Sequence, residues 1–190
     1  LVAFMQIFTT QAQDLVLQGI IDFTTPTGGN SGKAIHVKAI NAIPDLSVYG
    51  IGVANNGGGT DGEEYNFDAI AVSAGDDILV ARDIAVMTAY FDACATEFEH
   101  VLQANNDISQ NGDDAIELYL NGTVIETFGD IDTDGTGEAW EYMDSWAYRT
   151  GIGSVAPPQP TLISECGDFD AGPNTSWPYV LEAANVADGP

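Results

Sequence analysis

The chain has 190 residues, 45% of them hydrophobic, and this length provides the core of one domain but not of two ordinary ones. Its 29 acidic residues stand against four basic ones, giving a formal net charge of −25. Such a surface repels a phosphate backbone, so direct nucleic-acid binding is disfavoured. It suits salty water and attracts divalent cations.

The first residues predict an exported protein. Leu1–Phe8 is an apolar run, and the small residue Ala12 precedes a plausible cleavage point, as in the tail of a secretory signal peptide. We therefore assign residues 1–12 to a signal-peptide remnant and 13–190 to the domain. A first strand or a disordered end is the alternative for the apolar run. No apolar stretch of the sequence is long enough to cross a bilayer.

Short segments rich in β-forming residues alternate with clusters of Gly, Asn and Asp, the pattern of a β-sandwich or barrel. The predicted strands are 15–23, 34–40, 46–53, 67–72, 78–81, 116–120, 123–128 and 145–148. One helix is predicted after the N-cap Asp83, because Ile84, Met87, Tyr90 and Phe91 share one face. An irregular C-terminal segment begins at about 151, with one returning strand near 177–181.

A glycine-rich loop connects the segments around residues 51 and 66. It lacks the lysine and the helix of a phosphate-binding loop, which disfavours nucleotide binding. Asp61, Glu63 and Glu64 are candidates for a second cation site, and a flexible surface turn is the alternative.

A hairpin is predicted around Asn121-Gly122, a pair that accepts the positive φ angles of a type I′ turn. That turn fixes a register in which Leu120 faces Thr123 and Glu117 faces Glu126. By the same register, Leu118 faces Ile125, Ile116 faces Thr127 and Tyr119 faces Val124. Opposed glutamates repel each other, so solvent, a basic side chain or a cation should offset them.

The stretch from Asp130 to Glu141 matches the calcium-loop spelling D-x-D-x-D-G-x5-E. Alternate Asp residues on a tight turn can point several carboxylates at one ion, and Gly135 permits the bend. We predict a structural Ca²⁺ held by Asp130, Asp132, Asp134 and Glu141. A plain acidic turn is the alternative, because Asp and Gly also dominate turns. The flanking residues favour strands, so the two helices of an EF-hand are not expected.

The sequence holds two cysteines, Cys94 and Cys166. In an exported protein they can form a disulfide that closes a long loop. Two buried free thiols are the alternative, and the sequence does not decide between them.

Catalytic signatures are missing from the sequence. His36 and His100 do not stand in a zinc-ligand spacing, and no G-x-S-x-G or cysteine-nucleophile motif occurs. The acidic pairs at 76–77 and 113–114 would serve a glycosidase only if two carboxylates faced each other in space, and solvated turns are the alternative. We therefore predict a non-catalytic protein, although catalytic groups can converge from distant strands.

Six segments, 32–36, 43–59, 73–81, 111–119, 129–142 and 146–149, together cover most of 14–185. Their sequences resemble the lamin-tail-like domains of secreted bacterial proteins. The resemblance implies an immunoglobulin-like β-sandwich, commonly a binding or accessory module and sometimes attached to extracellular nucleases or other hydrolases. His36 stands where such domains often have an acidic residue. Metazoan nuclear versions lack the Asp130–Glu141 loop, so a nuclear or chromatin role is not transferred.

Together these observations predict an all-β protein, an immunoglobulin-like β-sandwich with one short helix. We expect a secreted adhesion or binding module that attaches to a cell-surface or matrix component, either protein or polysaccharide. An accessory domain of a larger secreted nuclease or hydrolase is the main alternative. A stand-alone enzyme acting on acidic carbohydrates is the third.

Overall fold

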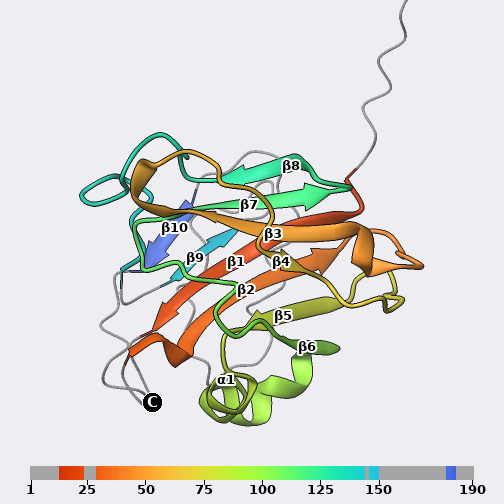
Figure 1. Cartoon of the computed structure of the whole chain (residues 1–190). Coiled ribbons are helices and arrows are strands. Elements are labelled where there is room, and N and C mark those ends of the chain that lie inside the picture. The colour runs from red at the N-terminus through yellow and green to blue at the C-terminus, as the bar shows by residue number, and fades with distance from the viewer. Residues whose placement is uncertain (1–12, 24–28, 144–145, 150–178, 183–190) are drawn as a thin grey trace, which may run out of the picture.

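Two β-sheets pack face to face in the computed structural model of this protein, which describes residues 13–23, 29–143, 146–149 and 179–182 (Figure 1). The six-stranded sheet has the order β10-β9-β1-β2-β5-β6, and the four-stranded sheet has the order β4-β3-β7-β8. The helix α1 lies outside the sandwich, beside the six-stranded sheet. The predicted all-β sandwich with one short helix is confirmed.

The strands of the six-stranded sheet are β1 (Leu15–Phe23), β2 (Gly32–Ala39), β5 (Asp77–Ala81), β6 (His100–Gln103), β9 (Trp146–Arg149) and β10 (Tyr179–Glu182). Those of the four-stranded sheet are β3 (Tyr49–Ala54), β4 (Tyr65–Asn66), β7 (Ala115–Leu120) and β8 (Thr123–Phe128). The helices are α1 (Ile84–Phe91) and the 3-10 turns Gly29–Ser31, Leu46–Val48, Asn55–Gly57 and Asp92–Glu97. Among these strands only β5 and β6 pair in parallel, because α1 and the following 3-10 turn carry the chain across between them.

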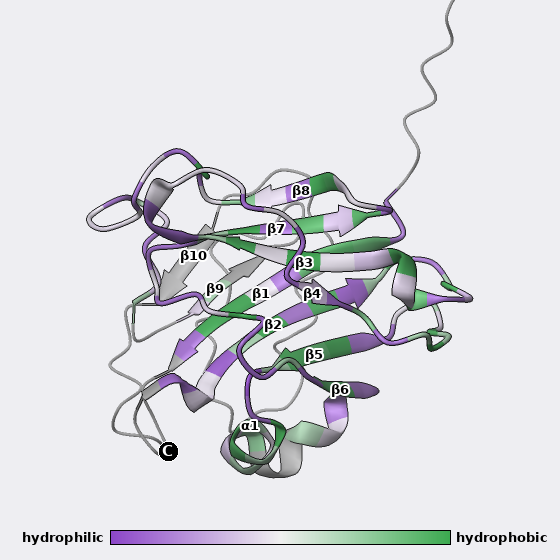
Figure 2. Cartoon of the chain, in the orientation of Figure 1, coloured by the Kyte–Doolittle hydropathy of each residue, from purple (hydrophilic) through white to green (hydrophobic). Residues whose placement is uncertain are grey.

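The alternation of side chains along the strands builds two apolar clusters. Ile35 and Val37 of β2 face the other sheet and join the main core, while Ala34 faces outward. The main core lies between the sheets, and a second cluster lies between α1 and the outer face of the six-stranded sheet. Figure 2 shows hydrophobic segments on the strands of both sheets. Each fully buried aliphatic or aromatic side chain stabilises the fold by about 1.5–3 kcal/mol.

The helix α1 begins where the sequence predicts it. Asp83 caps the first turn, since its side chain accepts a hydrogen bond from the backbone N–H of Val86 at 3.1 Å. Met87, Tyr90 and Phe91 are buried against the six-stranded sheet. The predicted N-cap and apolar face are confirmed.

The hairpin between β7 and β8 turns at Asn121 and Gly122, whose φ angles of 51° and 73° are those of the predicted type I′ turn. Next to the turn, Leu120 pairs with Thr123 and Tyr119 with Val124, as predicted.

The rest of the predicted hairpin register is wrong, because a bulge adds Ile125 between paired residues of β8. Glu117 consequently pairs with Thr127 and not with Glu126. Glu126 reaches the other sheet, where its Oε2 accepts a hydrogen bond of 2.9 Å from the backbone N–H of Leu17. The bulge thus keeps Glu117 and Glu126 from pairing, and Glu126 connects the two sheets.

Three other segments differ from the prediction. Leu46–Val48 forms a 3-10 turn, because Asp45 caps it by accepting a hydrogen bond of 3.1 Å from the Ser47 N–H. Residues 67–72 form no strand, and contribute only the bridge between Val72 and Ile43. The sequence pattern does not predict β6, since its four residues carry too little alternation to be recognised.

Some predictions lie outside the described residues. They include the signal-peptide remnant at 1–12, most of the segment from about 151, and Cys166. The side chain of Cys94 is also outside the description, so the disulfide stays a prediction. The returning strand is confirmed as β10, which pairs with β9. Among the described residues, no helix has the length and apolar character needed to span a membrane.

Candidate functional site

Three segments that are far apart in the sequence meet at one end of the sandwich. They are the β3–β4 connection (55–64), the segment that leads into β7 (105–114) and the loop that follows β8 (129–143). The Gly59 N–H donates to the Ile131 carbonyl at 2.8 Å, and the Gly135 N–H donates to the Asp113 carbonyl at 2.9 Å. We call these three segments the acidic end, because carboxylates dominate their side-chain chemistry.

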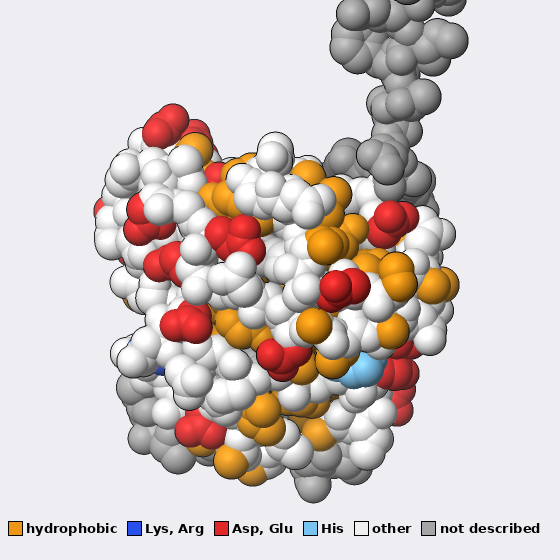
Figure 3. Space-filling view, turned by 45° about the vertical axis from the view of Figure 1, so that its right-hand side comes forward, with side chains coloured by type: hydrophobic (Ala, Val, Ile, Leu, Met, Phe, Trp, Pro, Cys, Tyr) orange, Lys and Arg blue, Asp and Glu red, His pale blue; other side chains and the backbone are white. Residues whose placement is uncertain are grey.

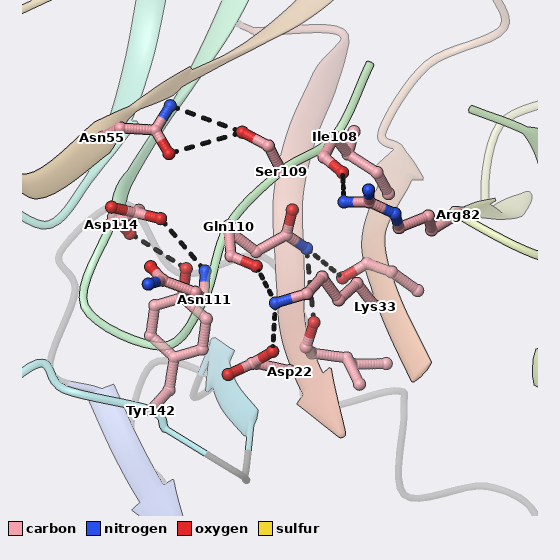
Figure 4. A network of polar contacts seen from close by, with 12 residues as sticks. Asp22, Lys33, Asn55, Arg82, Ile108, Ser109, Gln110, Asn111, Asp114 and Tyr142 are labelled. Atoms are coloured by element: carbon pink, nitrogen blue, oxygen red, sulfur yellow. Dashed lines mark hydrogen bonds and ion pairs between the residues drawn. The ribbon is translucent and has the colours of Figure 1, made fainter. Parts of the chain in front are cut away.

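Asp114 is the centre of the acidic end (Figure 4). Its side chain is fully buried, and its two oxygens accept hydrogen bonds from the backbone N–H groups of Asn56, at 2.7 Å, and Asn111, at 3.0 Å. Its backbone carbonyl accepts a hydrogen bond of 3.0 Å from the Tyr142 hydroxyl. Burial raises the pKa of the Asp114 carboxyl, against the two backbone hydrogen bonds, which favour its charged form. One aspartate thus fastens all three segments.

The predicted calcium ligands form hydrogen bonds within their own loop. The Asp130 carboxylate accepts a hydrogen bond of 3.0 Å from the Asp132 N–H, and the Asp134 carboxylate accepts one of 2.9 Å from the Thr136 N–H. The Glu141 carboxylate accepts one of 2.8 Å from the Gly137 N–H. Hydrogen bonds from Thr136 lower the pKa of the exposed Asp134 carboxyl. The first half of the loop is therefore a series of Asx-type turns.

The four predicted ligands are not gathered around one point. In the described part of the chain, no group of three or more His, Cys, Asp or Glu residues is close enough to hold a metal ion. A Ca²⁺ ion prefers about six to eight oxygens at 2.3–2.6 Å, which this arrangement of carboxylates does not provide. Calcium binding by Asp130, Asp132, Asp134 and Glu141 stays a prediction. The strand β8 precedes this loop and β9 follows it, as the sequence predicts in place of the two helices of an EF-hand.

The glycines of the loop make close contacts with the rest of the acidic end. A Cβ on Gly135 would lie 2.6 Å from the Trp140 ring and 2.7 Å from the Asp113 carbonyl oxygen. A Cβ on Gly57, which has a φ of 66°, would lie 2.4 Å from the backbone nitrogen of Asp134. The Trp140 ring in turn packs edge-on against Phe128, with ring centroids 6.1 Å apart. In this structure Gly135 serves the packing of the loop, and its φ angle is not among the positive ones that favour glycine.

The β3–β4 connection folds back over the outer face of the four-stranded sheet. The Glu64 carboxylate accepts a hydrogen bond of 2.9 Å from the Val53 N–H, and Glu63 occupies the space that a side chain on Gly50 would need. Burial raises the pKa of the Glu64 carboxyl, and nearby acids including Asp61 raise it further. Glu63 and Glu64 are therefore used in packing this connection. A second cation site at Asp61, Glu63 and Glu64 stays a prediction.

Two basic side chains, Lys33 and Arg82, bind backbone carbonyls of the segment that leads into β7 (Figure 4). Lys33 is buried between the sheets, where its Nζ lies 2.6 Å from Asp22 and also donates to the Gln110 carbonyl. Arg82 donates to the Ile108 carbonyl at 3.0 Å. These two cations hold the backbone of the segment that leads into β7, and the sequence analysis does not predict these contacts. A lone lysine inside an apolar strand is the one sequence feature that indicates them, because a buried lysine needs a buried partner.

Lys38 is also engaged, because its Nζ lies 3.2 Å from Asp77, and only the side chain of Arg149 lies outside the description. Figure 3 shows scattered Asp and Glu side chains over one face of the molecule and almost no Lys or Arg. The described surface therefore carries negative charge with little compensation from basic residues.

The acidic pairs considered for catalysis are occupied by structural contacts. Asp76 and Asp77 lie beside His100 and His36, at 3.4 and 2.8 Å respectively. Asp113 accepts a hydrogen bond of 2.9 Å from the Thr136 hydroxyl. These contacts explain the two pairs without assigning them a reaction.

Comparisons of the chain with models of protein families, with curated proteins and with solved structures found no match.

Proposed function

We propose that the protein is a secreted, non-catalytic binding module whose acidic end attaches to positively charged groups on a cell-surface or matrix component. The observation that carries the proposal is the fixed assembly of three loops by Asp114 and by the contacts between backbones. Such loop clusters on a rigid sandwich are common binding surfaces. The resemblance to lamin-tail-like modules supports the same proposal.

Charge supports a cationic partner. Exposed carboxylates at Asp61, Asp132 and Glu138 lie on the acidic end, while the described basic residues are turned inward. A field of one sign attracts groups of the opposite sign and repels anionic polymers, including nucleic acids.

Exchanging two exposed carboxylates of the acidic end tests the proposal. The double variant Asp132→Asn/Glu138→Gln is expected to weaken binding to immobilised polylysine and to the cationic polysaccharide chitosan by about twofold to thirtyfold, because exposed charge pairs contribute about 0.2–1 kcal/mol each. The matched control is Asp68→Asn/Glu97→Gln, which removes the same charge from exposed sites elsewhere. An equal loss in both variants would mean that the whole surface, and not the acidic end, attracts the cation.

Calcium provides a separate test of the loop prediction. Because the loop is already held by protein contacts, we expect the domain to stay folded in chelator. Calcium at about ten times its Kd would add about 1.4 kcal/mol to the stability of the native state. That addition raises the Tm of a domain of this size by about 3–5 °C, measured by calorimetry. An unchanged Tm in millimolar Ca²⁺ would contradict the predicted calcium site, but it would not bear on the proposed binding surface.

A further inference from the structure

Both histidines of the chain lie beside aspartates at the start of the strand β5. His36 of β2 places its Nε2 2.8 Å from Asp77, and His100 of β6 places its Nε2 3.4 Å from Asp76. The strand β5 lies between β2 and β6, so the two consecutive aspartates connect three strands through imidazole groups. The proposed binding surface does not use this cluster.

His36 lies beneath the segment that crosses from β5 to β6. Its side chain is 1% exposed, and the Phe98 ring packs edge-on against it, with ring centroids 5.2 Å apart. Phe98 in turn packs on Phe91 at the end of α1, also at 5.2 Å. We call residues 82–99 the crossover segment. It covers an apolar part of the six-stranded sheet that includes Ala34 and Leu79.

The charged groups around His36 come from three directions. Asp77 of β5 accepts its hydrogen bond, Lys38 of β2 shares that carboxylate at 3.2 Å, and Glu99 precedes β6. Burial lowers the pKa of His36, and this effect exceeds the opposing influence of Asp77. Burial would raise the pKa of Asp77, but its bonds to His36 and Lys38 hold that pKa below the usual value. Asp77 therefore stays ionised in mild acid.

These contacts make the closure of the crossover segment dependent on protons. In the closed state the lowered pKa keeps His36 neutral at neutral pH. When the segment opens, the imidazole is exposed to water and regains a pKa of about 6.5. Since the lowered pKa belongs to the closed state, closure is favoured fully above pH 6.5 and weakens as the pH falls. Between pH 6.5 and the lowered pKa of the closed state, one proton taken up on opening changes the opening equilibrium by at most about tenfold per pH unit.

We propose that His36 is an acid-operated latch, which keeps the crossover segment closed over β2 and β5 at neutral pH and releases it in mild acid. Release uncovers the apolar face of the six-stranded sheet that α1 and Phe98 otherwise cover. The sheets themselves stay paired, because the main core lies on the opposite side of β2 and β5.

Hydrogen exchange of the full chain between pH 7 and pH 5 tests the latch. After correction for intrinsic exchange rates, the amides of α1 are expected to lose protection by up to about tenfold per pH unit below pH 6.5. Amides of β7 are expected to keep theirs. His36→Gln, which keeps a hydrogen-bond donor for Asp77 but cannot titrate, should abolish the pH dependence. His100→Gln, at the more exposed pair, should retain it.

Two results would overturn the latch. One is a loss of protection in β7 with the same slope as in α1, which would mean that acid unfolds the whole domain. The other comes from NMR titration of the wild-type protein, where two histidines give two resolvable imidazole signals. If His36 gains its proton near pH 6.5 while the crossover segment stays protected, no latch exists. This measurement decides the question even if His36→Gln does not fold.

Discussion

Lys33→Met is expected to lower the free energy of unfolding by about 3–5 kcal/mol, because it leaves the Asp22 carboxylate buried without its cation. The Lys33 and Asp22 side chains are only 5% and 7% exposed, so water cannot replace the lost partner. The variant also removes the donor to the Gln110 carbonyl, which helps to hold the segment leading into β7. Urea unfolding followed by circular dichroism measures the loss.

Two further variants distinguish a buried charge from lost packing. The double variant Asp22→Leu/Lys33→Met removes both charges, and should recover much of the loss, since replacing a buried pair by apolar residues is often neutral or stabilising. Lys38→Met should cost less than Lys33→Met, because its partner Asp77 is more exposed and keeps the hydrogen bond to His36. If the double variant is as unstable as Lys33→Met, packing and not charge is responsible.

Gly135→Ala is expected to destabilise the domain by about 1–3 kcal/mol through overpacking, and to displace the loop that follows β8. The new methyl would lie 2.6 Å from the Trp140 ring and 2.7 Å from the Asp113 carbonyl oxygen, which cannot move without disturbing the backbone that leads into β7. A changed near-ultraviolet circular dichroism signal from Trp140 reports the displacement. Weaker binding to a cationic matrix should accompany it if the acidic end is the binding surface.

Gly137→Asn is the matched control in the same loop. Gly137 has a φ of 78°, but a Cβ added there would have no neighbour within 4 Å, and asparagine tolerates positive φ better than most residues. This variant should leave stability nearly unchanged. Equal losses in the two variants would show that the contact of residue 135 with Trp140 is not the cause of the loss.

The fold was largely predictable because it depends on local patterns. The strand from Leu15 to Phe23 and the turn at Asn121 carry signals that need no distant partner. The bulge at Ile125 carries no such signal. It brings Glu126 to the Leu17 N–H of the opposite sheet, and this contact exists only once both sheets have assembled.

The candidate site was less predictable than the fold. The residue pattern from Asp130 to Glu141 predicts a cation site, but Asp and Gly are also the residues that turns favour. In the structure, carboxylate oxygens of this loop accept hydrogen bonds from backbone N–H groups. In the sequence, Asp114 stands out only as part of an acidic pair. Its role depends on Asn56 and Tyr142, which are separated from it by 58 and 28 positions. Spacing along the chain cannot reveal such a meeting.

The position of the basic residues along the strands has a consequence for resistance to proteases. Trypsin-like proteases cut after lysine or arginine, and they need an extended, accessible backbone around the cut. Lys33 and Lys38 lie within β2, Arg149 lies within β9, and Arg82 directly follows β5. All four cleavage points of the 190-residue chain are thus in or beside paired strands. Trypsin should leave the folded domain intact and digest it only after it unfolds.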